Sequence, residues 1–470
     1  MDRARVYDVA IVGAGPAGIF AALELTRPGR LRVALVDEGL DLSERLARRH
    51  DSHHADPHLL LHGFGGAGAF SDGKLTLSID VGGHLAELLG ESQARALISR
   101  ADQIWLAFGA PAELYGANPD VLADLQKRAV RCGLQLVEVP LRHVGTDNAP
   151  RILAGIRDAL VPRCDLLMGT RVLHVEPAHS GFALETSAGT LRARYVILAP
   201  GRSGAAWLRQ EVERLGLSTT PNPVDIGVRV EAPAAVLSEL TDSLYEFKLL
   251  YWSRRFDNLV RTFCVCPYGE VVVERIGDVL TVNGHSYAAR RTANTNFALL
   301  VSSRFTHPFN DPIGYGLYIA KLANLLAGGV LVQRLKDLRL GRRSTWARIE
   351  KSIVKPTLPD ATPGDLSYAL PYRHLAALME MLEAMEGLTP GIWEGHVLLY
   401  GVEIKLYSQR LTLTSELETE IANLFACGDG AGVTRGLIQA SASGIAVAEA
   451  ILRREGIVLS DESAPISDSD

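Results

Sequence analysis

The hydrophobic residues near both ends of the chain follow the same order of short apolar runs and glycine turns. The apolar run Val9–Val12 opens directly into glycines, a second run continues from Ile19 to Leu25, and a third, LRVALV, ends at Asp37. Short apolar runs bounded by turns predict buried strands, and the run after the glycines predicts a helix. Residues 423–452 repeat the order of strand, glycine turn and amphipathic helix. Both ends therefore predict parts of one α/β domain.

The middle of the chain has a different pattern. From residue 221 onward, short runs such as DIGVRVEA, EVVVER and VLTVNG are separated by turn residues, among them Tyr268-Gly269 and Asn283-Gly284. This spacing is typical of antiparallel strands. We therefore predict an α/β fold with a discontinuous, Rossmann-like binding domain and an inserted domain built on a mixed or antiparallel β-sheet. The predicted boundaries are 1–217 and 396–457 for the two parts of the binding domain, 218–395 for the inserted substrate or cap domain, and 458–470 for a disordered acidic tail.

Composition narrows the class of protein. Hydrophobic residues make up 47% and charged residues 22% of the 470 residues, as in an ordinary globular protein, and a net charge of −6 offers no basic face for nucleic acid. No apolar run is long enough to span a membrane. The five scattered cysteines form no C-x-x-C, so we expect reduced thiols in a cytoplasmic protein. The histidines of residues 50–62 predict a polar connecting loop rather than a metal site, because no cysteine or H-E-x-x-H helix supports one.

The N-terminal glycines have the G-x-G-x-x-G spacing of a dinucleotide-binding turn. Gly13 permits the tight turn, Gly15 lets a pyrophosphate approach the backbone, and Gly18 lets the helix pack against the strand. The phosphates would bind N–H groups at the positive end of the helix dipole. Asp37, about twenty residues further on, suits a ribose hydroxyl. The spacing favours a dinucleotide site over a glycine turn without ligand, and the contact residues that it predicts are Gly13, Ala14, Gly15, Pro16, Ala17, Gly18, Asp37 and Glu38.

A second glycine-rich segment, GFGGAGAFSDGKLTL (residues 63–77), follows the second predicted strand. So many glycines indicate either a backbone that passes very close to a ligand or a flexible lid. Its place after the second strand of a dinucleotide domain favours the first reading, with the loop wrapped around a flavin and its pyrophosphate. The predicted contacts are Gly65, Gly66, Ala67 and Gly68, with Ser71 and Asp72 beside the ring.

Three later segments add to this site. Val172 begins a short strand, where an adenine commonly meets backbone, and the strand RARYVILAPG ends in small residues. Pieces that lie hundreds of residues apart suit an extended FAD, whereas a simple nicotinamide domain would be contiguous. Asp429 can accept from a ribityl hydroxyl, with helix N-capping as the alternative, and the turn after it can face the flavin pyrimidine edge, where negative charge develops on reduction. The predicted FAD contacts are Val172, Ala199, Gly201, Gly428, Asp429, Gly436, Leu437, Ile438 and Gln439.

At these motifs the chain resembles a known family, the FAD-dependent dehydrogenases also termed NAD(FAD)-utilizing dehydrogenases, within the broad glutathione-reductase-like class of two-domain flavoproteins. The resemblance rests on GAGPAG, GFGGAGAFSDGKL, VRTFCVCPYGEVV, VNGHS, NTNFALLV, PTLPDATPGDL, LLYGVEIKLYS and ACGDGAGVTRGLIQASASG, and it covers nearly the whole chain except the tail. It implies FAD as the cofactor and assigns the glycines, acids and turns named above to FAD. The family is poorly defined in substrate.

Fewer residues are candidates for catalysis than for FAD binding. A dehydrogenation needs a substrate C–H over flavin N5 and a base for the other proton. His285, on the inserted sheet, is the candidate base, with a turn-closing histidine as the alternative. Arg435, in the predicted flavin turn, is a candidate for holding a carboxylate or balancing reduced flavin, while a surface or phosphate-facing role is equally open. Cys264 and Cys266 lie on the same side of a strand and predict core residues, with a redox pair as the alternative.

These features together predict an FAD-dependent oxidoreductase that moves a hydride equivalent between flavin N5 and a small organic substrate. No cysteine pair at redox spacing lies beside the flavin loop, which disfavours a disulfide reductase. Because no second G-x-G-x-x-G occurs, NAD(P)H and other electron donors or acceptors stay open as the redox partner. The alternatives are a flavin-dependent monooxygenase and a flavoprotein whose FAD is structural and which recruits a partner.

Overall fold

The computed structural model describes residues 5–51, 61–70, 73–145, 148–220, 222–287, 290–305, 308–309, 311–406 and 410–458. The chain divides into two compact units, each assembled from separate stretches of sequence. Each unit has its own buried hydrophobic core. Unit 1 comprises Met1–Leu114, Leu141–Thr220 and Ser408–Asp470, and unit 2 comprises Tyr115–Pro140 and Pro221–Tyr407.

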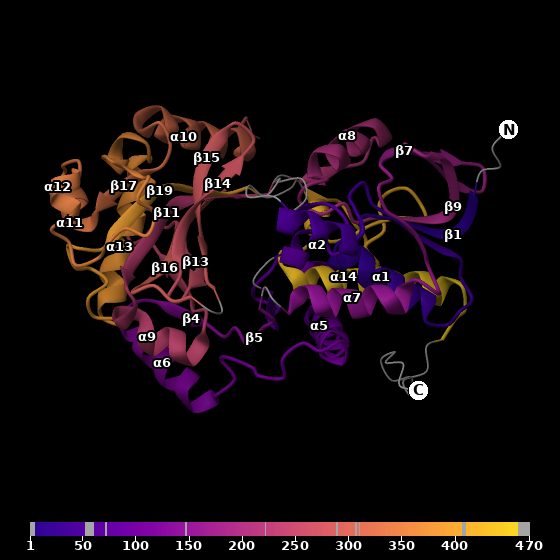
Figure 1. The fold of residues 1–470 in the computed structure, drawn as a ribbon, viewed down its shortest axis with the longest axis horizontal. Coiled ribbons are helices and arrows are strands. Elements are labelled where there is room, and N and C mark those ends of the chain that lie inside the picture. The colour runs from indigo at the N-terminus through magenta and orange to yellow at the C-terminus, as the bar shows by residue number, and fades with distance from the viewer. Residues whose placement is uncertain are drawn as a thin grey trace. The chain divides into compact units, whose positions relative to one another are not determined.

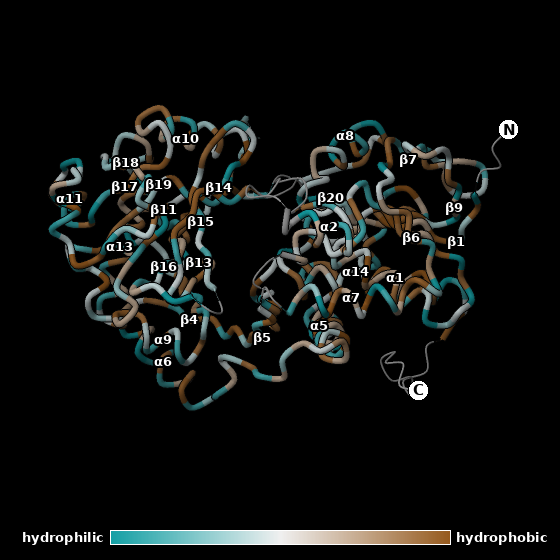
Figure 2. Tube along the Cα trace, viewed as in Figure 1, coloured by the Kyte–Doolittle hydropathy of each residue, from teal (hydrophilic) through white to brown (hydrophobic). Residues whose placement is uncertain are grey.

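Unit 1 is built on a sheet with a parallel centre. β1 pairs in parallel with β2 on one side and β9 on the other, and β21 also runs parallel to β9. Strands of a parallel sheet are covered on both faces, which is why all four residues of β2, VALV, are buried. Figure 2 shows the hydrophobic colour gathered around β1, β6 and β9. In sheet order the strands are β6 (Asp165–Leu167), β2 (Val33–Val36), β1 (Arg5–Val12), β9 (Gly189–Leu198), β8 (Gly181–Thr186) and β7 (Val172–Ala178), with β21 (Leu424–Ala426) on β9; two short ladders join β3 (Lys74–Thr76) to β5 (Leu141–His143) and β10 (Thr219–Thr220) to β20 (Arg410–Leu411).

Two helices that follow glycine turns, α1 and α14, pack side by side in unit 1 (Figure 1). Gly444 allows the close approach, because a Cβ at this position would lie 2.0 Å from the carbonyl oxygen of Ala17. The apolar spacing of residues 85–107 predicts one helix, but Gly90, with φ of +85°, divides it into α4 and α5. The helices are α1 (Pro16–Thr26), α2 (Leu42–Asp51), α4 (Leu85–Leu89), α5 (Glu91–Ala107), α7 (Ala149–Leu160), α8 (Ala205–Leu215) and α14 (Leu437–Arg454), with 3-10 turns η1 (Gly66–Phe70) and η3 (Asp429–Ala431).

Unit 2 is built on an eight-stranded mixed sheet, in which β17 and β18 pair in parallel and the other pairs are antiparallel. Its central strands β19, β11 and β16 are buried along almost their whole length. The predicted combination of a Rossmann-like domain with an inserted mixed sheet is therefore confirmed. In sheet order the strands are β18 (Thr362–Pro363), β17 (Leu331–Arg334), β19 (Leu398–Lys405), β11 (Val224–Pro233), β16 (Asn294–Ser303), β13 (Leu259–Cys266), β12 (Lys248–Trp252) and β4 (Gln135–Val137).

A separate hairpin and several helices complete unit 2. The hairpin pairs β14 (Glu270–Ile276) with β15 (Val279–His285). The expectation of a turn at Asn283-Gly284 is wrong, because both residues pair with β14 inside the ladder, and the chain reverses at Gly277 instead. The helices are α6 (Pro119–Arg131), α9 (Ala234–Leu244), α10 (Pro312–Ala327), α11 (Leu335–Arg339), α12 (Trp346–Ile349) and α13 (Tyr372–Glu386), with the 3-10 turn η2 (Leu366–Tyr368).

The two units differ from the predicted boundaries in two places. The predicted inserted domain, 218–395, ends before β19, but β19 lies between β11 and β17 in the sheet of unit 2. Residues 115–140 also belong to unit 2, because β4 pairs with β12. The predicted acidic tail, 458–470, lies outside the described residues except for Val458.

Candidate functional site

The three glycines of the G-x-G-x-x-G turn have different surroundings. Gly13 has φ of +111°, and a Cβ there would lie 2.1 Å from the carbonyl oxygen of Ala199. A Cβ on Gly18 would lie 1.9 Å from the carbonyl oxygen of Gly13. These two positions therefore require glycine for the turn and for helix–strand packing. Gly15 has φ of −79°, and a Cβ there would meet no atom within 4 Å, so this position borders open space.

The N-terminus of α1 is uncapped beside this space. Gly15 occupies the N-cap position, Pro16 follows it, and no side chain of the described residues accepts a hydrogen bond as a cap. The first-turn N–H groups therefore keep the positive end of the helix dipole exposed to the open space. An uncapped helix N-terminus next to open backbone fits a pyrophosphate.

Asp37 joins three backbone segments around the turn. Its Oδ2 accepts from the N–H of Ala14 at 2.8 Å, and its Oδ1 accepts from the N–H groups of Gly39 and Gly63, each at 2.8 Å. Oδ2, which accepts only one of these hydrogen bonds, keeps a second lone pair for a ribose hydroxyl. Asp37 therefore lies beside the turn and also fixes the start of the second glycine segment, a structural role that its spacing alone does not reveal.

The second glycine segment lies against both helix N-termini. The N–H of Gly65 donates to the carbonyl oxygen of Ala14 at 2.8 Å. A Cβ on Gly66 would lie 3.1 Å from Cα of Gly15, and a Cβ on Gly68 would lie 2.7 Å from Cδ2 of Leu437, the first residue of α14. The structure thus brings the predicted loop next to the predicted phosphate turn. Ala67 is half-buried in the same loop, whereas Ser71 and Asp72 lie outside the described residues.

Arg45 of α2 holds this loop in place, and the sequence analysis missed it. The residue is 1% exposed; Nη1 donates to the carbonyl oxygen of Phe64 at 2.5 Å and Nη2 to that of Gly66 at 3.0 Å. Burial lowers the pKa of Arg45 to about 10, while the charge of Asp37 opposes that shift. The guanidinium therefore stays protonated at neutral pH. Arg45 follows other charged residues in an amphipathic helix, so no local motif distinguishes it from a surface arginine.

The turn before α14 repeats the arrangement at α1. Gly436 is the N-cap residue, with φ of +94°, and a Cβ there would meet no atom within 4 Å. Asp429 accepts from Oγ1 of Thr434 at 2.9 Å and lies 4.0 Å from Nε of Arg202. Burial raises the pKa of Asp429, and the Arg202 charge and the Thr434 hydroxyl oppose this shift. Ile438 and Gln439 are buried in the first turn of the helix.

Backbone contacts bring the distant predicted pieces together. A Cβ on Gly428 would lie 3.0 Å from Cβ of Ala17, and a Cβ on Gly430 would lie 2.3 Å from the carbonyl oxygen of Gly201. The N–H of Ala199 donates to the carbonyl oxygen of Val12 at 2.8 Å. The strand ends of β1, β9 and β21 and the start of α1 therefore meet at one edge of the sheet, which is where ligands bind in open α/β sheets.

A segment around Gly82 and Gly83 packs on the α14 turn and was also missed. Gly83 forms an antiparallel bridge with Thr434, and Nε2 of Gln439 donates to the carbonyl oxygen of Val81 at 2.6 Å. Among the described residues, Oε1 of Gln439 is buried without a hydrogen-bond partner. This unsatisfied acceptor fits a ligand with an N–H group. The glycine pair, both members at positive φ, is the signal in the sequence that would have revealed the segment.

The other end of the site contains Val172 and Glu38. Val172 is the first residue of β7, and the residues just before it are tied to the Asp37 segment: the N–H of Thr170 donates to the carbonyl oxygen of Asp37 at 2.8 Å. Glu38 pairs with Nε of Arg171 and Nδ1 of His62, each at 2.6 Å. Glu38 and Val172 therefore lie at the same corner of the sheet.

The two catalytic candidates lie in different units. His285 ends β15 in unit 2 and is exposed, with its ring 6.4 Å from that of Tyr287. Arg435 lies in unit 1 within the α14 turn, where its N–H donates to the carbonyl oxygen of Gly82 and its charge opposes the rise that burial causes in the pKa of Asp429. Arg435 is thus part of the predicted flavin turn.

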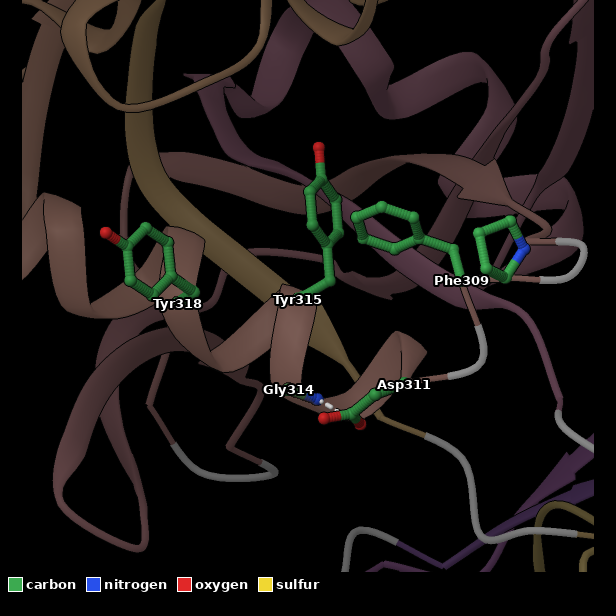
Figure 3. Close-up of a pocket in the computed structure, with 6 residues that line it drawn as sticks. Phe309, Asp311, Gly314, Tyr315 and Tyr318 are labelled. Carbon is green, nitrogen blue, oxygen red and sulfur yellow. Dashed lines mark hydrogen bonds between the residues drawn. The ribbon is translucent and has the colours of Figure 1, made fainter.

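Unit 2 has a surface hollow of about 550 Å³ at the start of α10 (Figure 3). Figure 3 shows the rings of Tyr315 and Phe309 beside each other, and Asp311 turned toward the helix backbone, where its Oδ1 accepts from the N–H of Gly314 at 2.8 Å. The carboxylate therefore serves as a helix cap, and the lining presents mainly aromatic surface. The lining residues are Pro308, Phe309, Asp311, Gly314, Tyr315 and Tyr318.

A Rossmann-like unit with two uncapped helix N-termini at open glycines defines a dinucleotide-binding fold of the flavoprotein type. Comparison with protein families agrees with this class. The family described as FAD binding domain matches residues 8–46, and the family described as FAD-dependent protein, C-terminal domain-like, matches residues 223–406. The protein is therefore FAD-dependent, and the prediction of FAD as the cofactor is confirmed.

The chain is also similar to individual proteins. It is 28% identical over 474 residues to an uncharacterized protein of Clostridium beijerinckii, with 94% of this chain and 80% of that protein covered. Pyridoxine 4-oxidase from Mesorbium loti is similar in structure, with a TM-score of 0.43, 14% identity, and coverage of 96% of this chain and 99% of that one. Glycine oxidase from Geobacillus kaustophilus matches with a TM-score of 0.39, 16% identity, and coverage of 96% and 95%, respectively.

The described residues contain neither a membrane-spanning helix nor a metal-binding cluster. No helix there combines the length and apolar character needed to cross a membrane. No cluster of three or more His, Cys, Asp or Glu side chains there is arranged to hold a metal ion.

Proposed function

We propose that the protein is an FAD-dependent dehydrogenase or reductase that moves a hydride equivalent between flavin N5 and a small organic substrate. The observation that carries this proposal is the convergence of two open, uncapped helix N-termini, at Gly15 and Gly436, on one glycine loop. The bound FAD would supply a reversible hydride acceptor.

In this proposal the chain holds FAD mainly with its backbone. The first-turn N–H groups of α1 bind the pyrophosphate, and the loop Gly65–Gly68, held by Arg45, covers it. Asp37 and Glu38 accept from ribose hydroxyls. Val172, Ala199 and Gly201 border the extended cofactor. Asp429 accepts from a ribityl hydroxyl.

The N-terminus of α14 would hold the flavin pyrimidine edge, where its uncapped N–H groups and the positive end of its dipole would stabilise negative charge. Residues Gly436–Gln439 supply these groups. Arg435 adds a positive charge beside them and either balances reduced flavin or holds a substrate carboxylate. His285 accepts the substrate proton at a ring nitrogen. NAD(P)H or another small electron carrier is the second redox partner, and a cytoplasmic location suits five cysteines that form no disulfide.

Anaerobic reduction of the purified, FAD-loaded protein tests the proposed reaction. NADH, NADPH and panels of small amines, hydroxy acids and amino acids are added separately while the flavin absorbance is followed. Bleaching by at least one organic compound, with the oxidised product detected by mass spectrometry, is the expected result. A flavin that stays oxidised with every compound, yet is reduced by dithionite, indicates structural FAD and contradicts the proposal. Incorporation of oxygen into a product in air indicates a monooxygenase and contradicts it as well.

Replacement of His285 tests the proposed base once a reducing substrate is known. His285→Ala is expected to slow flavin reduction and to leave the bound FAD content unchanged. The control is His174→Ala, which removes a half-exposed histidine of unit 1 that is hydrogen-bonded to Glu211 at 2.8 Å. Equal rates of reduction for His285→Ala and the wild type remove His285 from the mechanism and leave the FAD assignment intact.

A further inference from the structure

Two cysteines of unit 2 lie beside a fully buried arginine. Cys264 and Cys266 are both thiols at the end of β13; Cys266 is 1% exposed and Cys264 is half-buried. Arg229, on β11, is 0% exposed, and its Nη2 lies 3.1 Å from Sγ of Cys266 and donates to the carbonyl oxygen of Cys264 at 2.7 Å. A guanidinium this close favours the thiolate form of a cysteine over the thiol.

The local charges also favour an anionic sulfur. Arg229 Nη1 and Lys405 Nζ both approach the carboxylate of Glu403, at 3.4 and 3.0 Å, and Glu403 is 0% exposed. Glu274 approaches Lys405 at 3.5 Å, but its side chain is about one-third exposed. The fully buried part of the cluster is the Arg229–Glu403 pair, and Lys405, whose side chain is 16% exposed, pairs with both Glu403 and Glu274. A thiolate at Cys266 supplies the second negative charge beside Arg229.

An unsatisfied donor lies on the neighbouring strand. Asn296 is opposite Cys266 in the β13–β16 ladder and is 0% exposed. Its Oδ1 accepts from Nε of Arg229 at 2.7 Å, whereas its Nδ2 is buried without a hydrogen-bond partner among the described residues. Buried donors without partners are rare and costly. This donor suits an oxygen atom added to the Cys266 sulfur.

The backbone of β13 is irregular at the two cysteines. Cys264 has φ of +46°, which is uncommon for a residue with a side chain, and the ladder shifts register between Phe263 and Cys266. Sγ of Cys266 lies 3.6 Å from the carbonyl oxygen of Cys264, so the Cys266 side chain turns back over residue 264. The bulge interrupts the regular spacing that a straight strand would impose on residues 264 and 266.

Two other buried cysteines provide an internal contrast. Cys164 and Cys427, in unit 1, are buried, and burial raises the pKa of each thiol to about 12. Within the described residues, no guanidinium donates a hydrogen bond to either sulfur. Burial therefore favours the neutral thiol at these two positions, and the neighbouring arginine distinguishes Cys266.

We propose that Cys264 and Cys266 form a peroxide-reactive thiol pair, in which Cys266 is the attacking thiolate held by Arg229 and Cys264 is the resolving thiol. Hydrogen peroxide is the oxidant. This proposal rests on unit 2 alone and does not depend on the proposed flavin reaction.

The oxidation has two balanced steps. The Cys266 thiolate attacks one oxygen of hydrogen peroxide; an S–O bond forms, the O–O bond breaks, and hydroxide leaves and takes a proton from solvent. Cys266 loses two electrons and becomes a sulfenic acid, whose oxygen Asn296 Nδ2 can bind. The Cys264 sulfur then attacks Sγ of Cys266; an S–S bond forms, the S–O bond breaks, and the hydroxyl leaves as water with the Cys264 proton.

Peptide mass spectrometry of the full-length, FAD-loaded protein tests this proposal. Trypsin cleaves after Arg261 and Arg275, so both cysteines lie in one peptide, TFCVCPYGEVVVER. After reduction, desalting and addition of a few equivalents of hydrogen peroxide, this peptide is expected to lose two hydrogens and its reactivity toward iodoacetamide. Cys164 and Cys427 in the same sample are expected to stay reduced.

Single variants separate the two roles. With Cys264→Ser, dimedone is expected to label Cys266 and no disulfide to form. With Cys266→Ser, Cys264 is expected to stay reduced at the same peroxide concentration. Arg229→Lys keeps a buried cation and is expected to slow disulfide formation. Oxygen addition without disulfide, oxidation of Cys264 in Cys266→Ser, equal oxidation of Cys164 and Cys427, or no oxidation of the wild-type peptide overturns the proposal.

Discussion

The two units place polar groups in the interior in opposite ways. In unit 1, the candidate site is made of backbone: Gly15 and Gly436 leave two helix N-termini uncapped and open. In unit 2, the polar interior is made of side chains: Arg229, Glu403 and Lys405 lie inside the molecule and contact one another across β11 and β19. The backbone site keeps donors for a ligand, whereas each charged group of the side-chain network contacts a group of opposite charge.

This difference has a thermodynamic consequence. A ligand that binds only the folded state stabilises the protein through its own affinity, so changes at an open site appear as changes in cofactor binding. Removal of one partner from a buried ion pair leaves an uncompensated charge and costs about 3–5 kcal/mol of stability. We therefore expect substitutions in unit 1's site to alter FAD content, and substitutions in unit 2's network to alter the free energy of unfolding.

Gly15→Val is expected to give the largest effect, a loss of FAD affinity of at least about 10⁴-fold, or about 5.5 kcal/mol. The φ of −79° at Gly15 accepts any residue and its Cβ direction is open, so the apoprotein is expected to fold. The added side chain fills the space beside the first-turn N–H groups. The measurement is the flavin absorbance of the purified protein and a titration with FAD, with circular dichroism to check folding.

Gly329→Val is a suitable control for this change. Gly329, in unit 2, also lacks a positive φ, and the nearest atom to a Cβ there is 4.0 Å away. A yellow Gly15→Val protein with wild-type affinity would show that the phosphates of FAD do not lie at this turn. A colourless Gly329→Val protein would show that valine at an open glycine perturbs binding from a distance.

The backbone site was largely predictable from the sequence, because close backbone approach requires glycine and leaves a local pattern. Gly13, Gly15 and Gly18 are three residues of one turn, and the loop at Gly65–Gly68 is equally compact. Arg45 was not predictable, since a buried arginine and a surface arginine look alike in an amphipathic helix. The same holds for the amides that Asp37 binds, which depend on three chain segments meeting in space.

The side-chain network was not predictable, because its members come from strands that are distant in sequence. Arg229 and Glu403 are single charges inside otherwise apolar strands, and nothing in DIGVRVEA or LLYGVEIKLY shows that they pair. The predicted end of the inserted domain, at residue 395, differs from the end of unit 2, at Tyr407, for the same reason. The sequence pattern assigns the segment of β19 to the second part of the binding domain. Its hydrogen bonds to β11 and β17 place it in unit 2.

Glu403→Gln is expected to give the next largest effect and to reverse the pattern of Gly15→Val. The amide leaves the fully buried Arg229 without its carboxylate partner, whereas Lys405 keeps Glu274 at 3.5 Å, so the free energy of unfolding is expected to fall by about 3–5 kcal/mol. FAD content of the folded protein is expected to stay at the wild-type level. Chemical denaturation at saturating FAD measures the first quantity, and the flavin-to-protein ratio measures the second.

Arg454→Met provides the matched control in unit 1. Arg454 pairs with Glu416 and Glu418, each at 2.6 Å, but its side chain is 29% exposed. Partly exposed pairs contribute at most about 1 kcal/mol. Equal losses of stability for Glu403→Gln and Arg454→Met would mean that burial does not distinguish the two networks, and the contrast between the units would fail.

The smallest expected effect is a pH-dependent loss of stability that comes from His374 in unit 2. His374 is 3% exposed, Nε2 is 2.8 Å from Oγ of Ser303, and burial, aided by the Arg373 charge, lowers the His374 pKa to about 4. Between pH 6.5 and 4 the unfolded chain therefore binds a proton that the folded chain does not. The folded state loses stability as the pH falls through this range, by about 2 kcal/mol between pH 7 and 4.5.

His374→Gln removes the group that takes up this proton. The difference in the free energy of unfolding between wild type and variant is therefore expected to be about 2 kcal/mol smaller at pH 4.5 than at pH 7. Ser303→Ala removes the hydrogen bond but keeps the imidazole, so its stability is expected to follow the wild-type pH slope. Denaturant unfolding of the three proteins across this range measures the difference directly. A constant gap between His374→Gln and the wild type would mean that the buried imidazole takes up its proton as easily as an exposed one. The interior of unit 2 would then accept a charge without a partner at no cost in stability. That result would contradict the expectation that unpaired buried charges destabilise unit 2.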